Sequence, residues 1–396
     1  MRLSQKLTLL AGASCAAIAV FISLSGKEPV WLDGLLFDRA LAVRASLSPS
    51  PTLASKVAVV SFDPESLEMD ALKRRPRGLF GPVWAKLIPS LVAAEARGIN
   101  FDLIFEYSGD KFRDESGDQI LSHYDNSFRQ ALFENRSDLV LAYSAETLPA
   151  KSYLQLLSED PGALGIINYN PDADSVHRHI PAEIKNDKGK RVLTLLGAAL
   201  ARAKVQKDTV PDTIILAPSG HPEEIIPTYK LEKVLACAES DPEALRQALK
   251  GRVVFIGWTG PEQDRKVSSS RFISPQNRMP PALSPCGLQR VKASVPTANN
   301  IPGVHLWALA AEAVLSNQLT EKAARYVAAS VAGIAAIVGT MIGFLLAPLW
   351  AILAIVSVCA GLWALEISLI GIGLWLPVGL GVISAVASEI GRASCR

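Results

Sequence analysis

Residues 326–387 hold three apolar runs, which read YVAASVAGIAAIVGTMIGFLL (326–346), LWAILAIVSVCAGLWAL (349–365) and IGIGLWLPVGLGVISAVA (370–387). A fourth apolar run covers residues 7–25. Each run is close to the length of the roughly 20-residue helix that crosses a bilayer core of about 30 Å. The pattern predicts four transmembrane helices, one before and three after a long polar stretch.

The charges around the first run predict the orientation of the chain. Arg2 and Lys6 precede this run, and basic residues stay preferentially in the cytoplasm. Residues 27–322 would then lie outside, in the periplasm of a multi-pass inner-membrane protein. Lys322 and Arg325 would also lie outside, which goes against the rule. We expect an uncleaved anchor rather than a cleaved signal peptide, because no Ala-x-Ala pattern ends the apolar run.

These features divide the chain into four parts: an anchor (1–26), an extracytoplasmic domain (27–322), three transmembrane helices (323–388) and a tail (389–396). Residues 390–395 read IGRASC, which equals one translated frame of a common sequencing-library adapter. We therefore expect the tail to be non-native and the native protein to continue into a cytoplasmic domain. The alternative is a short native basic tail.

Composition narrows the classes of function. The formal net charge of +2 over 396 residues gives no support to nucleic-acid binding, which usually needs a strongly basic face. Of the five cysteines, only Cys237 and Cys286 belong to the polar stretch. They could form one disulfide, but we favour two unpaired thiols. No Cys-x-x-Cys or other metal-ligand spacing occurs in the sequence, so we expect no metal and no cofactor.

The polar stretch alternates between two kinds of pattern. Short apolar runs rich in β-branched residues predict strands over residues 57–63, 99–105, 138–143, 165–170 and 252–258. Apolar residues at helical spacing predict helices over residues 82–98, 120–132, 193–200, 242–251 and 304–317. Such alternation predicts an α/β fold, with a mostly parallel sheet covered by helices. Residues 260–302 are rich in Ser, Pro, Asn and Gln and predict a long irregular insertion.

Catalytic motifs are missing from the sequence. It has no Gly-x-Ser-x-Gly elbow, no phosphate-binding Gly-x-x-x-x-Gly-Lys loop and no Gly-x-Gly-x-x-Gly. The acidic turn at 168–174, which reads NYNPDAD, could bind calcium, but an ordinary polar turn is the favoured interpretation. We expect that the chain has no catalytic residues.

One general rule predicts where a ligand would bind. In open parallel sheets, ligands bind beyond the carboxyl ends of the strands. Asp63, Glu106, Tyr107 and Trp258 occupy such ends in the predicted fold, so they are the candidate ligand-binding residues. The carboxylates would favour a cationic or hydroxyl-bearing ligand. The alternative is that these side chains only hold loops together.

Several segments, in this order, resemble one known family. They are Leu36-Phe-Asp-Arg39, Val57-Ala-Val-Val-Ser-Phe-Asp-Pro-Glu-Ser-Leu67, Arg75-Pro-Arg77, Ile99-Asn-Phe-Asp102, Val253-Val-Phe-Ile-Gly-Trp-Thr259 and Pro302-Gly-Val-His305. Together with one leading and three trailing spans, they resemble the CHASE sensor domain of the second type, a sensory extracellular domain associated with cyclases and histidine kinases. The resemblance covers nearly the whole chain and implies a stimulus receiver placed before a cyclase or kinase domain.

The leading hypothesis is therefore a membrane-anchored sensory domain of a bacterial receptor, truncated before its output domain. The alternatives are a membrane-anchored extracytoplasmic enzyme and an envelope assembly or binding protein. The expected partners are membrane lipid, an unidentified extracytoplasmic ligand or protein, and a second copy in a homodimer, with no nucleic acid.

Overall fold

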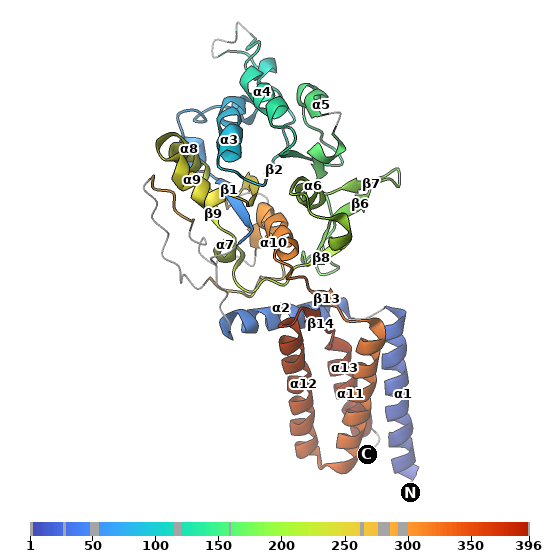
Figure 1. Ribbon diagram of the computed structural model, residues 1–396. Helices are drawn as coiled ribbons and strands as arrows, with labels where there is room; N and C mark the ends of the chain where they lie inside the picture. Colours follow the sequence, from blue (N-terminus) through green and yellow to red (C-terminus); the bar gives the residue numbers. More distant parts are fainter. Residues whose placement is uncertain are drawn as a thin grey trace.

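The structure is a computed structural model that describes residues 3–26, 29–47, 55–114, 117, 120–157, 160–261, 265–275, 286–291 and 300–394. Arg2 of the charged start and the tail residues Cys395 and Arg396 lie outside these ranges. An α/β domain occupies one end of the molecule and a bundle of long helices the other (Figure 1).

A six-stranded parallel sheet forms the centre of the α/β domain. Its strand order is β4-β3-β2-β10-β1-β9. The strands are β1 (Val57–Phe62), β2 (Gly98–Asp102), β3 (Leu139–Tyr143), β4 (Leu164–Ile166), β9 (Thr228–Lys230) and β10 (Val253–Trp258). Five of them match the predicted strands, and the predicted parallel pairing is confirmed. The short edge strand β9 was not predicted.

Helices cover both faces of this sheet. On one face lie α3 (Gly81–Ala93), α4 (Asn126–Glu134), α5 (Lys151–Leu157), α8 (Leu231–Ser240) and α9 (Pro242–Leu249). The other face packs against α6 (Leu195–Arg202) and α10 (Gly303–Leu315). The interior strands β1 and β10 are buried along their whole length. This two-sided burial explains why they read as continuous apolar runs.

Some helix boundaries differ from the predictions. The helix predicted over residues 120–132 begins only at Asn126, after a turn in which His123 has a φ of 67°. Helix α9 is capped by Asp241, whose side chain accepts a hydrogen bond from the Ala244 amide at 3.1 Å. An aspartate in this position satisfies an amide that has no partner within the helix.

Smaller paired strands and a short helix complete the domain. They are β5 (His179–Pro181) with β8 (Thr213–Ile215), β6 (Glu183–Lys185) with β7 (Arg191–Leu193), β11 (Arg265–Val267) with β12 (Asn300–Pro302), and α7 (Pro222–Ile225). The β11–β12 pair lies within the segment that was predicted to be irregular.

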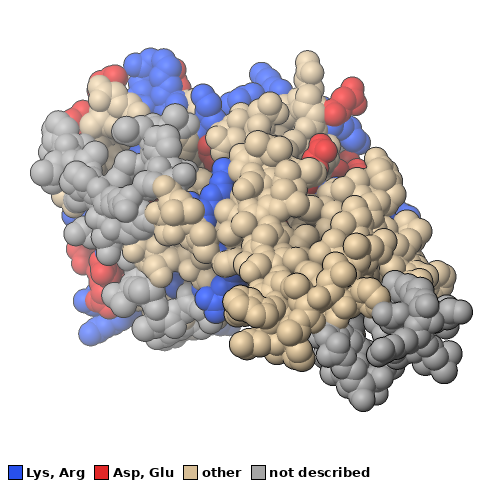
Figure 2. Space-filling view, turned by 90° about the horizontal axis from the view of Figure 1, so that it is seen from below, with Lys and Arg blue, Asp and Glu red and all other residues tan. Residues whose placement is uncertain are grey.

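The helical bundle consists of α1 (Leu3–Ser25), α11 (Arg325–Leu345), α12 (Pro348–Ile370) and α13 (Gly379–Ser394). Helix α11 packs against both α1 and α13. Large apolar side chains remain exposed on α11 and α12, among them Ile334, Met341, Trp350 and Val356. Seen from the bundle end, the surface nearest the viewer is mostly free of charged side chains (Figure 2).

The predicted number of transmembrane helices is not confirmed. Among the described residues, α11 and α12 are long and apolar enough to cross a bilayer. A third span results only if α1 from Ala13 and α2 (Val30–Leu47), which meet at 83°, are counted as one broken span. The run at 370–387 is not one helix, because β14 (Leu374–Trp375) interrupts it and pairs with β13 (Glu321–Lys322).

The two cysteines of the α/β domain form a disulfide, so our expectation of two free thiols was wrong. Cys237 lies on α8, and Cys286 follows 49 residues later in an irregular segment. The sequence could not show that this segment returns to α8, because disulfide partners are determined by the tertiary fold.

Candidate ligand-binding site

The four predicted site residues lie along one edge of the sheet. Because β1 pairs in parallel with β10, and β10 with β2, the carboxyl ends of these strands share that edge. Asp63 directly follows β1, and Trp258 is the last residue of β10. Glu106 and Tyr107 lie four and five residues beyond the end of β2 and are exposed.

Trp258 contributes to the hydrophobic core at this edge. Its side chain is 9% exposed, its ring centroid lies 5.2 Å from that of Phe62, and the Arg77 guanidinium lies 5.5 Å from the ring. Glu106 instead interacts with Tyr107, and a hydrogen bond to Glu106 raises the pKa of the tyrosine hydroxyl. The structure therefore places Trp258 in the core and leaves Glu106 and Tyr107 on the surface, so that Asp63 is the one predicted site residue among the described walls of the cavity at this edge.

A cavity of about 320 Å³ opens beside Asp63. Its described walls come from the end of β1, from α7 and β9, from the residues after β10 and from the start of α10, and they include Asp63, Glu223, Lys230 and His305. The start of α10 can approach β10 closely because Gly257 has no side chain. A Cβ atom at Gly257 would lie 2.7 Å from the Cβ of Val304.

His305 lines this cavity and has one ring nitrogen without a hydrogen-bond partner among the described residues. The hydroxyl of Thr228 lies 3.2 Å from the Ile226 carbonyl and 3.0 Å from His305 Nε2, and we assign its proton to the carbonyl. With this assignment Nε2 carries the ring proton and Nδ1 is an acceptor. Nδ1 is buried without a hydrogen-bond partner among the described residues. Burial lowers the pKa of His305 to about 3, so the ring is neutral.

Carboxylates outnumber cations around the cavity. Asp63, Glu65 and Glu223 line it together with one ammonium group, that of Lys230, among the described wall residues. Lys230 forms an ion pair with Glu65. Asp63 uses Oδ1 to accept from the Ser66 amide at 2.9 Å and from the Ser66 hydroxyl at 3.1 Å. The described walls thus carry a net negative charge.

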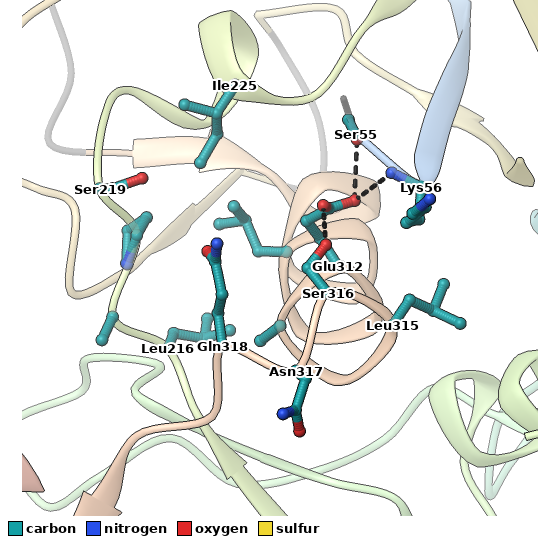
Figure 3. Close-up of a pocket in the computed structure, with 14 residues that line it drawn as sticks. Ser55, Lys56, Leu216, Ser219, Ile225, Glu312, Leu315, Ser316, Asn317 and Gln318 are labelled. Atoms are coloured by element: carbon teal, nitrogen blue, oxygen red, sulfur yellow. Dashed lines mark hydrogen bonds between the residues drawn. The ribbon is translucent and has the colours of Figure 1, made fainter. Parts of the chain in front are cut away.

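A second cavity, of about 470 Å³, lies at the opposite edge of the sheet. There the Glu312 carboxylate accepts hydrogen bonds from the Ser55 hydroxyl and the Lys56 amide, each at 2.8 Å, and from the Ser316 hydroxyl (Figure 3). These bonds attach the last turn of α10 to the start of β1. The side chain of Gln318 extends across the cavity from the segment that leads to α11 (Figure 3).

A third cavity, of about 810 Å³, lies beyond the carboxyl ends of β3 and β4 and beside the β6–β7 hairpin. Its described walls include Lys185 and Lys188, one carboxylate, Asp187, and His179. Among these residues the lysines outnumber the carboxylate, so this cavity differs in charge from the one beside Asp63.

A buried ion cluster joins the α/β domain to α2. Arg178 is fully buried and donates to both oxygens of Asp38, an α2 residue that is also fully buried. The same guanidinium donates to Asp174 at 2.8 Å and to Asp172 at 3.1 Å. Arg271 contacts Asp38 at 2.8 Å. Burial acts to raise the pKa of Asp174, but the hydrogen bonds and charge of Arg178 outweigh it and lower that pKa.

Sequence reasoning missed this cluster. Asp172 and Asp174 are the acidic residues of the turn that we interpreted as an ordinary polar turn, and they bind an arginine rather than calcium. The available signal was Arg178, which follows this turn closely and lies between two histidines. Its partner Asp38 is 140 residues away and belongs to the segment 36–39 that carries part of the family resemblance.

Helix α2 also contacts the helical bundle, and it lies across the molecule between the bundle and the α/β domain (Figure 1). The Gly379 amide at the start of α13 donates to Asp33 at 2.7 Å. The Trp363 indole of α12 donates to the Leu36 carbonyl at 3.3 Å. Arg44 donates to the carbonyl of Ile370, the last residue of α12, at 3.1 Å.

Comparison with known families identifies the family of the chain. The family model of the CHASE2 domain matches residues 14–349, so the chain belongs to the CHASE2 family. CHASE2 is a sensory extracellular domain of signal-transduction receptors and is not catalytic. No curated protein and no solved structure matches the chain.

Proposed function

We propose that this chain is the membrane-anchored, extracytoplasmic sensory part of a bacterial signal-transduction receptor. The family supports a sensory role. The two long apolar helices and their exposed apolar side chains support a place in a bilayer. The observation that carries the proposal is the position of α2, which holds the α/β domain through Asp38 and the helical bundle through Asp33.

This position gives α2 a direct mechanical role. A stimulus that changes the packing of the α/β domain would move Arg178, and the buried bidentate pair would pass that movement to α2. Because α2 also binds α12 and α13, their packing would change with it. Signals of this kind rely on an element with two alternative arrangements, whose populations the stimulus shifts.

The disulfide supports the extracytoplasmic placement. Disulfides persist in oxidising compartments such as the periplasm and are rare in the bacterial cytosol. The Cys237–Cys286 bond lies in the α/β domain, so this domain would be on the oxidising side. The α11–α12 turn lies at the opposite end of the bundle from the α/β domain (Figure 1) and would then face the cytoplasm.

Cysteine labelling in intact cells tests this placement. Cys15, Cys359 and Cys395 are first replaced by alanine, so that only the disulfide remains. Single cysteines are then introduced as Lys151→Cys, on the exposed surface of α5, or Ala347→Cys, in the exposed turn between α11 and α12. A membrane-impermeant maleimide is applied to spheroplasts before or after lysis.

We expect the α5 position to react in intact spheroplasts and the turn position to react only after lysis. The opposite pattern would place the α/β domain in the cytoplasm and would overturn the proposal. Reaction of both positions before lysis would show that the chain does not span the membrane as proposed.

A further inference from the structure

We propose that the cavity beside Asp63 binds a small amine cation and is the stimulus site of the receptor. This inference rests on the proposed function. The location supports it, because the cavity lies beyond the carboxyl ends of β1 and β10, two interior strands of the sheet. Open α/β sheets bind ligands in the crevice at such strand ends.

The hydrogen-bonding groups of the cavity are mainly acceptors, so a ligand that donates hydrogen bonds suits them. His305 Nδ1 is an acceptor without a partner among the described residues, on a side chain that is 1% exposed. Asp63 and Glu223 add carboxylate oxygens, which can only accept when they are ionised. An ammonium group has three donors and no acceptor, so one ligand group could serve His305 Nδ1 and a carboxylate together. A ligand carboxylate or phosphate would instead bring further hydrogen-bond acceptors next to the acceptors of Asp63, Glu223 and His305.

The charge and the size agree with this choice. Three carboxylates and one ammonium group line the described walls, so a cation gains from the local potential and an anion loses. The volume of about 320 Å³ is near the lower limit of small-molecule sites, which is about 300 Å³. The ligand class is therefore an amine with a short carbon chain, rather than a nucleotide or an oligosaccharide.

The cavity is also connected to the bundle by a short route. His305 is the third residue of α10, and the far end of this helix is attached to β1 through Glu312. The chain then passes through residues 316–324 into α11. A ligand that binds at His305 would stabilise one position of α10 relative to the sheet, and this position would be transmitted to the start of α11.

A set of four-carbon probes tests the ligand class on the purified full chain in lipid nanodiscs. The probes are 1,4-diaminobutane, n-butylamine, 1,4-butanediol and succinate, which share a chain length and differ in end groups. Binding is measured by isothermal titration at pH 7.5 and constant ionic strength. We expect saturable binding of at least one of the two amines, weaker binding of the diol and no binding of succinate.

Variants then locate the binding site. Asp63→Asn and Glu223→Gln should each weaken amine binding by about tenfold, because a charge-assisted hydrogen bond is lost. The matched control is Asp187→Asn, which removes a carboxylate from the 810 Å³ cavity and should leave binding unchanged. If Asp63→Asn fails to fold, Glu223→Gln provides the same test.

Three results would overturn the inference. The first is the absence of amine binding up to about 10 mM, a concentration at which binding of even a few kcal/mol would be detected. The second is preferred binding of succinate. The third is amine binding that is unchanged in both cavity variants. Succinate binding that Lys188→Gln abolishes would place the ligand in the 810 Å³ cavity instead. None of these results changes the cysteine-labelling pattern, so failure of the ligand class and failure of the proposed receptor topology remain distinguishable.

Discussion

Arg178 donates two parallel hydrogen bonds to Asp38, from Nε to Oδ1 and from Nη2 to Oδ2, each at 2.8 Å. Both side chains are fully buried. This bidentate geometry is the strong form of a charge-assisted pair, and it joins the α/β domain to the helix that contacts the bundle. Together with Arg271, which contacts Asp38 at 2.8 Å, the buried Arg178 attaches α2 to the α/β domain.

Breaking the Arg178–Asp38 ion pair should strongly destabilise the protein. Asp38→Asn removes one of the three carboxylates that pair with Arg178, and Arg178→Lys keeps a charge but loses the bidentate fork. Removing one partner of a buried ion pair costs about 3–5 kcal/mol. We expect a loss of this order for Asp38→Asn, measured by chemical unfolding of the full chain in micelles, and a smaller loss for Arg178→Lys. Hydrogen exchange should increase along α2 in both variants.

The matched control is Lys73→Gln, which removes an ion pair with Glu68 at 2.9 Å on the exposed surface. Exposed pairs contribute little, so we expect no measurable change. Equal stability of Asp38→Asn and the wild type would show that the buried pair does not hold α2.

Gly34 should tolerate no side chain, because it faces the same guanidinium. A Cβ atom at this position would lie 2.6 Å from Cζ of Arg178. The guanidinium cannot move away without breaking its hydrogen bonds to Asp38 and Asp174. Gly34→Ala should therefore lower the free energy of unfolding by about 1–3 kcal/mol, the usual cost of overpacking, despite the better helix propensity of alanine.

Gly361→Ala on α12 is the matched helical control, because no described atom outside its own helical turn lies within 4 Å of the place that a Cβ atom would take there. It should be neutral or slightly stabilising. A neutral Gly34→Ala variant would mean that Arg178 has a second acceptable position.

The disulfide should contribute substantially to the stability of the α/β domain. Cross-linking residues 49 positions apart restricts the unfolded chain by an amount worth about 4 kcal/mol in the chain-entropy model. We expect Cys286→Ser to lower the unfolding free energy by about 2–4 kcal/mol. Dithiothreitol should destabilise the wild type and leave Cys286→Ser unchanged. Cys359→Ser serves as the control, because Cys359 is a free thiol and this variant keeps the disulfide. If dithiothreitol destabilised Cys286→Ser as much as Cys359→Ser, the effect would not come from the disulfide.

The sequence predicts the sheet well because its interior strands β1 and β10 can be recognised from their residues alone. β1 and β10 are buried on both faces, so burial appears directly as a continuous apolar run. β9 has only three residues, too few to establish a period. Helix α2 was not predicted for a different reason. It buries Asp33 and Asp38 together with Phe37 and Leu41, so its buried surface is not an apolar stripe.

The sequence predicts which strand ends share an edge of the sheet, but not which other residues line the cavity there. The rule on strand ends identified Asp63 correctly as a residue at the carboxyl edge, since only the strand ends had to be known. It could not identify His305, Thr228 or Glu223, because α10, β9 and α7 reach this edge only through the tertiary fold. Likewise, Trp258 ends a strand but turns into the aromatic core, and sequence alone does not show which way a terminal side chain points.

The pH dependence of stability should reveal the neutral state of His305. Burial lowers its pKa to about 3, whereas an unfolded histidine has a pKa of about 6.5. Between these values the unfolded state binds more protons than the folded state, so the stability contribution is complete above a pH of about 6.5 and is lost as the pH falls. His177 and His221, whose pKa values burial also lowers, act in the same direction. Asp38, whose pKa burial raises to about 6, acts in the opposite direction, because between about pH 6 and 4 the folded state binds more protons at this carboxyl than the unfolded state does. The prediction is therefore made for the contribution of His305 alone, which should fall as the pH decreases from about 6.5 to about 4.5.

His305→Gln isolates the contribution of this residue, because glutamine can still donate to Thr228 and does not titrate. The slope of unfolding free energy against pH should decrease by up to about 1.4 kcal/mol per pH unit between about pH 6 and 4.5, measured by urea unfolding at several pH values. The control is His123→Asn at an exposed position with positive φ, which asparagine tolerates and which should keep the wild-type slope. If His305→Gln kept that slope too, His305 would be protonated in the folded protein, and its Nδ1 would be a donor instead of the acceptor on which the amine site depends.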